Sequence, residues 1–239
     1  MTAAASWAAV IVAAGRGSRF GRPKQFLELA GLPMAGWSMR TFAGMREVAE
    51  IVVATEGEWI DRMRELGASV APHRTVTVVA GGNSRQASVF AGLRAVSPRC
   101  DGAFVHDGAR PLVREDDVRA GMAEVRAGRG ALLAAPAVDT IKVVDAASRT
   151  VRETLDRSRL WAAQTPQFAL LSDLIRAHER GLAEGVEATD DAALLERIGI
   201  EVVVVPSTTE NFKVTLPEDV ARAEAFLRER PSTSPGRAG

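Results

Sequence analysis

The chain has 239 residues, 46% hydrophobic and 25% charged, which is typical of a globular protein and excludes disordered and fibrous classes. Its 30 acidic residues balance its 30 basic ones, so the overall charge gives no reason to expect a nucleic acid or a membrane surface as a partner. The only cysteine, Cys100, excludes an intramolecular disulfide and a zinc ribbon, and we expect a reducing, cytoplasmic location.

Apolar runs and amphipathic stretches alternate along the chain, which predicts an α/β domain whose mostly parallel sheet is covered by helices on both faces. The length fits a single domain over residues 1–230, and the Pro-, Ser- and Gly-rich tail 231–239 is expected to be disordered. Strands are expected at Ala8–Ala13, Ile51–Thr55, Val76–Ala80, Ala103–His106, Ala131–Pro136 and Glu201–Val205. Helices are expected at Ala35–Met45, Glu58–Leu66, Ser84–Val96, Glu115–Ala127, Leu171–Glu184, Asp190–Arg197 and Glu218–Arg228.

One section interrupts this alternation. Thr140–Val144 and Thr150–Leu155 are short β-like runs joined by a polar turn, which predicts an inserted hairpin, a projecting arm over about residues 138–158. A two-stranded hairpin is only marginally stable alone, so we expect it to pack against another surface such as a second subunit.

The segment Ala13–Lys24 follows the first strand with small residues and then cations. Glycines let the backbone approach a ligand and direct N–H groups towards phosphate oxygens, while Arg and Lys supply countercharge. The alternative is a tight turn with solvated basic side chains. A Walker loop is excluded because Gly21 is followed by Arg22-Pro23. A dinucleotide fingerprint fits poorly because Leu29–Gly36 does not read as a strand. The segment therefore predicts an anion site.

A second glycine pair, Gly81-Gly82, also precedes a predicted helix. Asn83 or Ser84 could cap that helix, and Asn83 and Ser88 could also read the edge of a nucleotide base.

The residues after the fourth strand are also placed for ligand binding, since ligands collect at the carboxyl ends of strands in doubly wound sheets. Asp107 could bind a ribose or a metal ion, and Arg110 could bind a phosphate; alternatively they form an ion pair that stabilises a turn. His106 is interpreted as structural.

Two later segments, Gln164–Gln167 and Asn211–Thr215, carry polar groups in positions that no core requires. Lys213 stands among apolar residues and is a candidate phosphate ligand. Thr215 and Glu218 fit a capping box for the last helix, and Asp190-Asp191 fit the amino end of a helix.

Together these motifs resemble the 2-C-methyl-D-erythritol 4-phosphate cytidylyltransferase family. The resemblance runs in order from about Ala8 to Leu227, and only the first motif is shared broadly with other sugar-nucleotide transferases. The motifs are Ala13-Ala14-Gly15-x-Gly17-x-Arg19, Pro23-Lys24-Gln25, Gly81-Gly82-x-x-Arg85-x-x-Ser88-Val89, His106-Asp107-x-x-Arg110-Pro111, Asp139-Thr140-x-Lys142, Thr165-Pro166-Gln167, Thr189-Asp190 and Asn211-x-Lys213-x-Thr215. The chain departs from the family in having Pro206-Ser207 where a glycine is usual.

The resemblance implies a Rossmann-like fold of the nucleotide-diphospho-sugar transferase type and a reaction of CTP with methylerythritol phosphate that releases pyrophosphate. It implies catalytic roles for Arg19, Lys24, Arg157 and Lys213. It implies nucleotide binding by Ala13, Ala14, Gly15, Gly17, Gly82, Asn83, Ser88 and Asp107. It implies acceptor binding by Asp107, Arg110, Thr140, Arg157, Thr165 and Lys213.

The resemblance also implies a homodimer in which the arm reaches the neighbouring subunit. We expect Mg²⁺ bound mainly through the CTP phosphates, and therefore no metal-ligand motif in the protein. A cytidylyltransferase for another polyol phosphate, such as ribitol 5-phosphate, is the nearest alternative. A non-catalytic nucleotide-binding regulator is the alternative from another class, and the retained Arg19, Lys24 and Lys213 argue against it.

Overall fold

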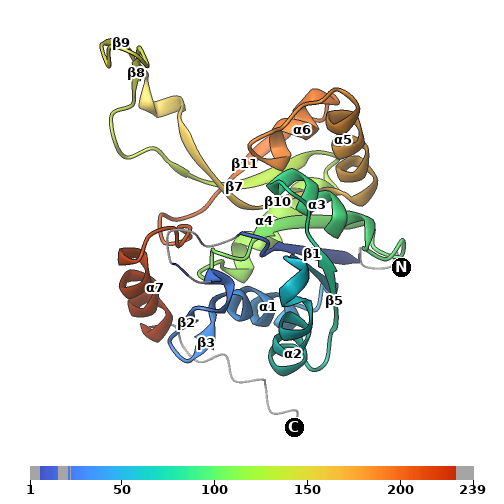
Figure 1. The fold of residues 1–239 in the computed structure, drawn as a ribbon. Coiled ribbons are helices and arrows are strands. Elements are labelled where there is room, and N and C mark those ends of the chain that lie inside the picture. Colours follow the sequence, from blue (N-terminus) through green and yellow to red (C-terminus); the bar gives the residue numbers. More distant parts are fainter. Residues whose placement is uncertain (1–5, 16–20, 22, 230–239) are drawn as a thin grey trace.

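The computed structural model describes residues 6–15, 21 and 23–229, and in this part of the chain seven strands form one sheet in the order β11-β7-β10-β6-β1-β4-β5 (Figure 1). These strands are β1 (Trp7–Val12), β4 (Val48–Thr55), β5 (Thr75–Ala80), β6 (Gly102–Asp107), β7 (Gly130–Pro136), β10 (Trp161–Leu170) and β11 (Val202–Pro206). β10 runs antiparallel to β6 and β7, and the other pairings are parallel. The predicted mostly parallel α/β fold is confirmed.

The helices are α1 (Met34–Gly44), α2 (Ile60–Val70), α3 (Arg85–Arg94), α4 (Glu115–Arg126), α5 (Leu171–Ala183), α6 (Asp191–Arg197) and α7 (Glu218–Glu229). Every strand and helix expected from the sequence is present with shifted ends. The segment Leu29–Gly36, which was not expected to be a strand, contains one residue of the two-residue strand β2 (Glu28–Leu29) and all of the two-residue strand β3 (Leu32–Pro33). None of the described helices is long and apolar enough to cross a bilayer.

β1 lies inside the sheet and is packed on both faces. Ile11 belongs to a buried cluster that includes side chains of α1, α2 and α4, whereas its neighbour Val10 belongs to a cluster with α3, α5 and α6. Both side chains are fully buried, and each such burial contributes about 1.5–3 kcal/mol. This packing explains why the strand reads as a continuous apolar run, and it gives the glycine loop that follows a rigid origin.

β10 was not predicted. Gln164, Thr165 and Gln167 were expected where no core requires polar groups, but all three are buried in this strand. Gln167 Oε1 accepts hydrogen bonds from the backbone N–H groups of Asp191 (2.9 Å) and Ala192 (2.8 Å). The Gln167 side chain thus satisfies backbone N–H groups that would otherwise be buried without partners. The expectation that no core requires these polar groups was wrong.

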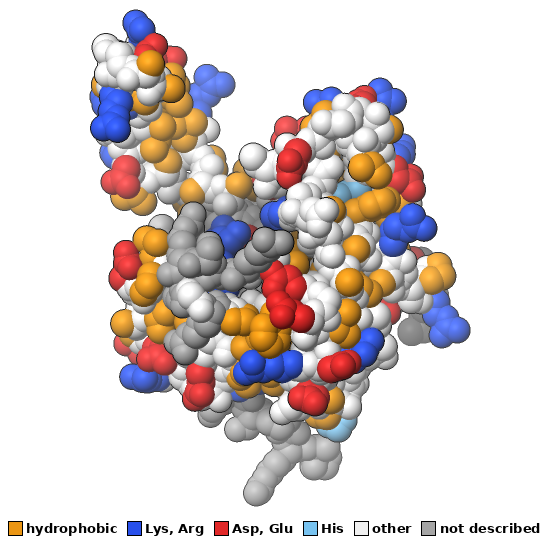
Figure 2. All heavy atoms as spheres, in the orientation of Figure 1, with side chains coloured by type: hydrophobic (Ala, Val, Ile, Leu, Met, Phe, Trp, Pro, Cys, Tyr) orange, Lys and Arg blue, Asp and Glu red, His pale blue; other side chains and the backbone are white. Residues whose placement is uncertain are grey.

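The predicted hairpin is present as β8 (Lys142–Val144) and β9 (Val151–Thr154), which pair antiparallel and project from the body (Figure 1). Its apolar side chains are largely exposed, with Val138 at 70% and Val151 at 55%. Figure 2 shows this arm standing clear of the body with hydrophobic and basic side chains on its surface. That it packs against a second subunit stays a prediction.

One helix amino end matches expectation and another does not. Asp190 caps α6 by accepting from Ala193 N, as predicted. The predicted Thr-x-x-Glu box at α7 is wrong: Asp219 instead accepts from the backbone N–H groups of Thr215 (2.7 Å) and Leu216 (2.8 Å). Asp219 lies one position after the predicted Glu218, and its carboxylate binds the backbone of the segment that leads from Lys213 into the helix.

Candidate active site

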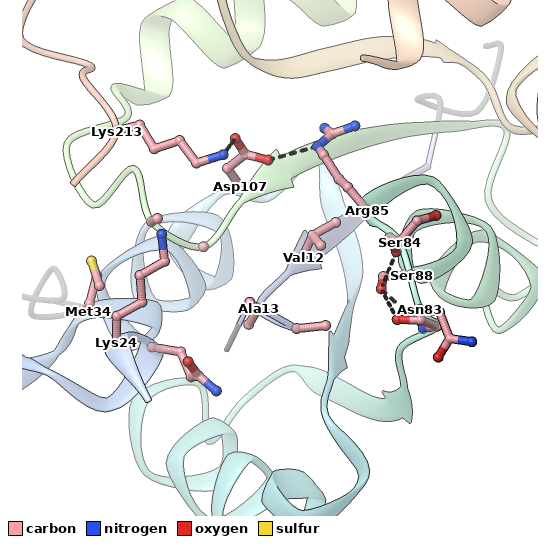
Figure 3. A pocket seen from close by; sticks show the side chains of 16 residues that line it. Val12, Ala13, Lys24, Met34, Asn83, Ser84, Arg85, Ser88, Asp107 and Lys213 are labelled. Atoms are coloured by element: carbon pink, nitrogen blue, oxygen red, sulfur yellow. Dashed lines mark hydrogen bonds and ion pairs between the residues drawn. The ribbon is translucent and has the colours of Figure 1, made fainter. Parts of the chain in front are cut away.

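A pocket lies where the carboxyl ends of β1 and β6 meet the amino end of α3 (Figure 3). The strand order reverses at β1, which is where open α/β sheets bind ligands. The described residues that line the pocket are Val12, Ala13, Ala14, Gly15, Lys24, Gln25, Met34, Gly82, Asn83, Ser84, Arg85, Ser88, Asp107, Gly108, Ala109 and Lys213.

Two glycines allow the loops after β1 and β5 to approach each other. A Cβ atom on Gly81 would lie 2.7 Å from the Ala14 Cβ and 2.8 Å from the Ser88 Oγ. On Gly82 it would lie 2.5 Å from the Ala87 Cβ. A larger residue at Gly81 would force the two loops apart, and one at Gly82 would force its own loop away from Ala87 in α3, so both positions need glycine for close approach.

The polar residues at the amino end of α3 were considered both as helix caps and as contacts to a nucleotide base. Ser84 is the cap and accepts from Ala87 N at 3.1 Å. Ser88 is buried, donates to Ser84 O at 2.9 Å and accepts from Gly82 N at 3.1 Å, so its hydroxyl shapes the glycine loop from within. Asn83 is exposed at the rim of the pocket, which leaves its amide for a ligand.

Asp107 is the centre of the pocket's electrostatics. Its Oδ2 accepts from Lys213 Nζ at 2.8 Å and its Oδ1 from Arg85 Nε at 3.2 Å (Figure 3). Arg110 Nε lies 3.9 Å from Oδ2, so the ion pair considered for the turn is present. Burial acts to raise the pKa of Asp107, but the charges of Arg85 and Lys213 outweigh it and hold the pKa well below its usual range. Asp107 is therefore a carboxylate at neutral pH.

His106 and Thr165 lie behind Asp107 and hold it. Thr165 Oγ1 accepts from Asp107 N at 2.9 Å and lies 3.2 Å from His106 Nδ1. Burial lowers the pKa of His106 to about 4, so the ring is neutral at pH 7, which agrees with its structural interpretation. Arg110 is similarly tied down because it donates to Asn211 O at 2.7 Å. Neither Thr165 nor Arg110 is among the residues that line the pocket.

Lys24 and Lys213 bring two cations to the same pocket from opposite ends of the chain. Lys24 belongs to the short 3-10 helix η2 (Lys24–Phe26), and its Nζ lies 3.5 Å from Val214 O. The predicted residues Gly17 and Arg19 lie outside the described residues. Thr140 and Arg157 are exposed on the arm, where Arg157 donates to Val138 O at 2.9 Å, and they do not line this pocket.

Seven lining residues were not among the predicted site residues: Val12, Gln25, Met34, Ser84, Arg85, Gly108 and Ala109. Gln25 is 3% exposed, and neither atom of its amide has a hydrogen-bond partner among the described residues. Its place in the motif with Lys24 was the available signal. Arg85 likewise belonged to a recognised motif, but its spacing could not show that its guanidinium reaches Asp107.

Comparison with known proteins identifies the group to which this architecture belongs. The family model of 2-C-methyl-D-erythritol 4-phosphate cytidylyltransferase matches residues 7–229. The chain belongs to this family. A cytidylyltransferase of this name from Halalkalibacterium halodurans is 40% identical, over 94% of this chain and 98% of its own. One from Streptomyces avermitilis is 44% identical, over 93% and 92%.

Solved structures agree with the family assignment. The 4-diphosphocytidyl-2C-methyl-D-erythritol synthase of Anaerococcus prevotii superposes with a TM-score of 0.84 at 26% identity, covering 94% of this chain and 99% of that one. The 2-C-methyl-D-erythritol 4-phosphate cytidylyltransferase of Thermus thermophilus gives a TM-score of 0.75 at 31% identity, covering 92% and 98%.

The chain's departure from the usual family pattern does not disturb the pocket. Pro206 ends β11 in register with Ala134, and Ser207 N donates to Ala134 O at 2.8 Å. Ser207 Oγ also donates to Asp117 at 2.7 Å. These bonds anchor the segment that leads to Asn211, whose buried amide donates to Thr165 O at 3.0 Å.

Proposed function

We propose that this chain transfers the cytidylyl group of CTP to 2-C-methyl-D-erythritol 4-phosphate and releases pyrophosphate. The observation that carries the proposal is the convergence of Lys24, Lys213 and Arg85 on one pocket that contains a single carboxylate, Asp107, among its described lining residues. Such a pocket suits two phosphorylated substrates, and the family to which the chain belongs is named for this reaction.

The chemistry requires positioning more than proton transfer. A phosphate monoester has a second pKa of about 6, so the acceptor phosphate is mostly dianionic at neutral pH and needs no general base. The protein has to hold two mutually repelling anions in line and stabilise charge that develops at the α-phosphorus. The neutral His106 and buried Thr165 support Asp107 and are not needed as acid or base.

In this reaction Arg19 and Lys24 stabilise charge on the triphosphate. The cytidine lies against the two glycine loops, with Asn83 reading the base and Asp107 accepting a ribose or acceptor hydroxyl. Support for this placement comes from the close approach of the two loops at Gly81 and Ala14 and from the exposed Asn83 amide.

The acceptor phosphate is held by Lys213 and by Arg157. Because Arg157 and Thr140 lie on the arm and away from the pocket of their own chain, we infer a homodimer in which each arm completes the other subunit's site. The exposed apolar side chains Val138 and Val151 support this inference, since an isolated hairpin would bury little.

Mg²⁺ fits this pocket as a substrate-bound ion. Among the described residues, no group of three His, Cys, Asp or Glu side chains could hold a metal, and Asp107 is already paired with cations. An ion that binds together with CTP would supply charge neutralisation for the leaving pyrophosphate. A cytoplasmic location is consistent with the single cysteine and the freely diffusing substrates.

A panel assay tests the proposal: pyrophosphate release from each of four nucleoside triphosphates with methylerythritol 4-phosphate or ribitol 5-phosphate. We expect release with CTP and methylerythritol 4-phosphate. Lys24→Ala should lower kcat on the order of 10²-fold, as loss of one transition-state donor does. Arg46→Ala, whose side chain is 93% exposed, is the matched control. Wild-type turnover in Lys24→Ala, or no release by the wild-type protein, would contradict the proposal.

Lys213→Ala separates the two substrates. We expect the KM for the acceptor to rise while CTP binding changes little, because Lys213 is assigned to the acceptor phosphate. If CTP binding alone collapsed, the role given to Lys213 would be wrong.

A further inference from the structure

Arg85 was not predicted as a site residue, yet its guanidinium holds two carboxylates. Its Nε donates to Asp107 Oδ1 at 3.2 Å, and its Nη2 donates to Asp191 Oδ2 at 2.9 Å. Asp107 lines the pocket, whereas Asp191 is 1% exposed in the first turn of α6. Figure 3 shows the bond from Arg85 to Asp107; through its second bond, to Asp191, Arg85 connects the pocket to a buried group outside it.

The far side of this connection is rigid. Asp191 Oδ1 lies 3.1 Å from His178 Nε2, and its backbone N–H donates to Gln167 Oε1. Next to Arg85, the Gln86 side chain donates to Val186 O at 3.1 Å and accepts from Ala188 N at 2.8 Å. The segment between α5 and α6 therefore fixes the backbone next to Arg85, and Asp191 in α6 fixes the direction of its side chain.

Lys213, the other cation bonded to Asp107, is held less firmly. Its side chain is 40% exposed, compared with 26% for Arg85, and among the described residues its carboxylate partner is Asp107 alone. Arg110 lies 3.9 Å from the same oxygen of Asp107 but is bonded to Asn211 O. When an anion enters the pocket, Lys213 can turn towards it, while Arg85 remains between its two carboxylates.

We propose that Arg85 is a positioning residue: anchored by Asp191, it keeps Asp107 oriented and its charge compensated while Lys213 leaves Asp107 for the acceptor phosphate. This inference rests on the proposed function, which assigns that phosphate to Lys213. Without Arg85, Lys213 would be the principal partner of Asp107, and the incoming phosphate would have to break that pair.

The test is steady-state kinetics of Arg85→Gln with each substrate varied in turn. We expect the KM for methylerythritol 4-phosphate to rise at least about tenfold, while the KM for CTP changes less than about threefold. Arg94→Gln, at the exposed opposite end of α3, is the matched control and should behave as wild type. A merely structural role would lower thermal stability or the fraction of active enzyme without selecting one substrate.

Asp191→Asn tests the anchor, since Asp191 does not line the pocket. It should raise the same KM, and the double variant with Arg85→Gln should be no worse than the worse single variant. If Arg85→Gln fails to fold, Arg85→Lys keeps the charge and should give a smaller rise in the same KM.

Three results would overturn the role of Arg85: an unchanged acceptor KM in the folded variants, an equal rise in the KM for CTP, or additive effects of the two substitutions. No turnover by the wild-type protein would instead overturn the proposed function and the role of Arg85 with it.

Discussion

Asp107→Asn removes the negative charge around which the pocket cations are arranged, and its effect on folding can be worked from the contacts. In the wild-type protein Lys213 Nζ lies 2.8 Å from Oδ2 and Arg85 Nε lies 3.2 Å from Oδ1. The asparagine amide keeps one acceptor oxygen, but its NH2 group would face one of these two donors and could not accept a hydrogen bond from it. Breaking a buried ion pair by removing one partner costs about 3–5 kcal/mol. Because Lys213 is 40% exposed and Arg85 retains Asp191, we expect the lower end, about 3 kcal/mol.

For a chain of this size that loss corresponds to a fall in Tm of roughly 6–12 °C, measured by calorimetry at pH 7. Asp116→Asn is the control, because that side chain is 88% exposed and its ion pair with Arg119 should contribute at most about 1 kcal/mol. Equal stability losses in the two variants would refute the assignment of a stabilising role to the Asp107 network.

The same reasoning fixes the sign of the pH dependence. The pKa of Asp107 is lower in the folded protein than its ordinary value of 3.8, so its contribution is complete above that value and is lost as pH falls through the folded-state pKa. The stability difference between wild type and Asp107→Asn should therefore be constant from pH 5 to 7 and narrow below about pH 4. A difference that widened in acid would contradict the depressed pKa.

Two further predictions concern buried positions. Gln25→Leu removes a buried amide that has no partner among the described residues, and each such polar atom costs about 1–3 kcal/mol. Urea unfolding should therefore show unchanged or increased stability, while the KM for CTP rises because Gln25 lines the pocket. A clear loss of stability would show that the amide is satisfied in the folded protein. Gly121→Ala would place a Cβ 2.4 Å from the fully buried Phe168 ring, so we expect it to lose about 1–3 kcal/mol in urea unfolding although alanine has the better helix propensity. Ala120→Gly, at an exposed position of the same helix, is the control because it changes helix propensity alone. Gly128 is not a suitable control because it has a positive φ.

The sequence predicted the parallel strands because each is a continuous apolar run, but it did not predict β10. The middle of that strand consists of Gln164, Thr165 and Gln167, whose polar character resembles a loop. They are tolerated in the core because each has a specific partner far away in sequence, such as Asp191 N for Gln167. Local patterns carry no record of such partners, so a satisfied polar strand cannot be distinguished from a binding loop in advance.

The candidate site was predictable where binding depends on local backbone form. The glycines at 81 and 82 and the residues Ala13-Ala14 lie where strand-to-helix junctions place them, at one edge of the sheet. Pairing was not predictable: Asp190-Asp191 read as two helix-end acids, but only Asp190 caps α6, whereas Asp191 points into the core to Arg85. The two carboxylates are adjacent in sequence and differ only in the direction that tertiary structure gives them.

The charge of the pocket shows why the net charge of the whole chain did not indicate an anionic substrate. Among its described lining residues, three cations (Lys24, Arg85 and Lys213) face one carboxylate, an excess of two positive charges in a chain whose net charge is zero. Before substrates bind, Asp107 compensates Arg85 and Lys213, which would otherwise repel each other across a poorly solvated space. When the acceptor phosphate binds, it can take over the compensation of Lys213, while Arg85 stays paired with Asp107 and Asp191. Asp107 thus keeps Arg85 and Lys213 close together in the free protein, so that the anion site we propose is assembled before either phosphate is present.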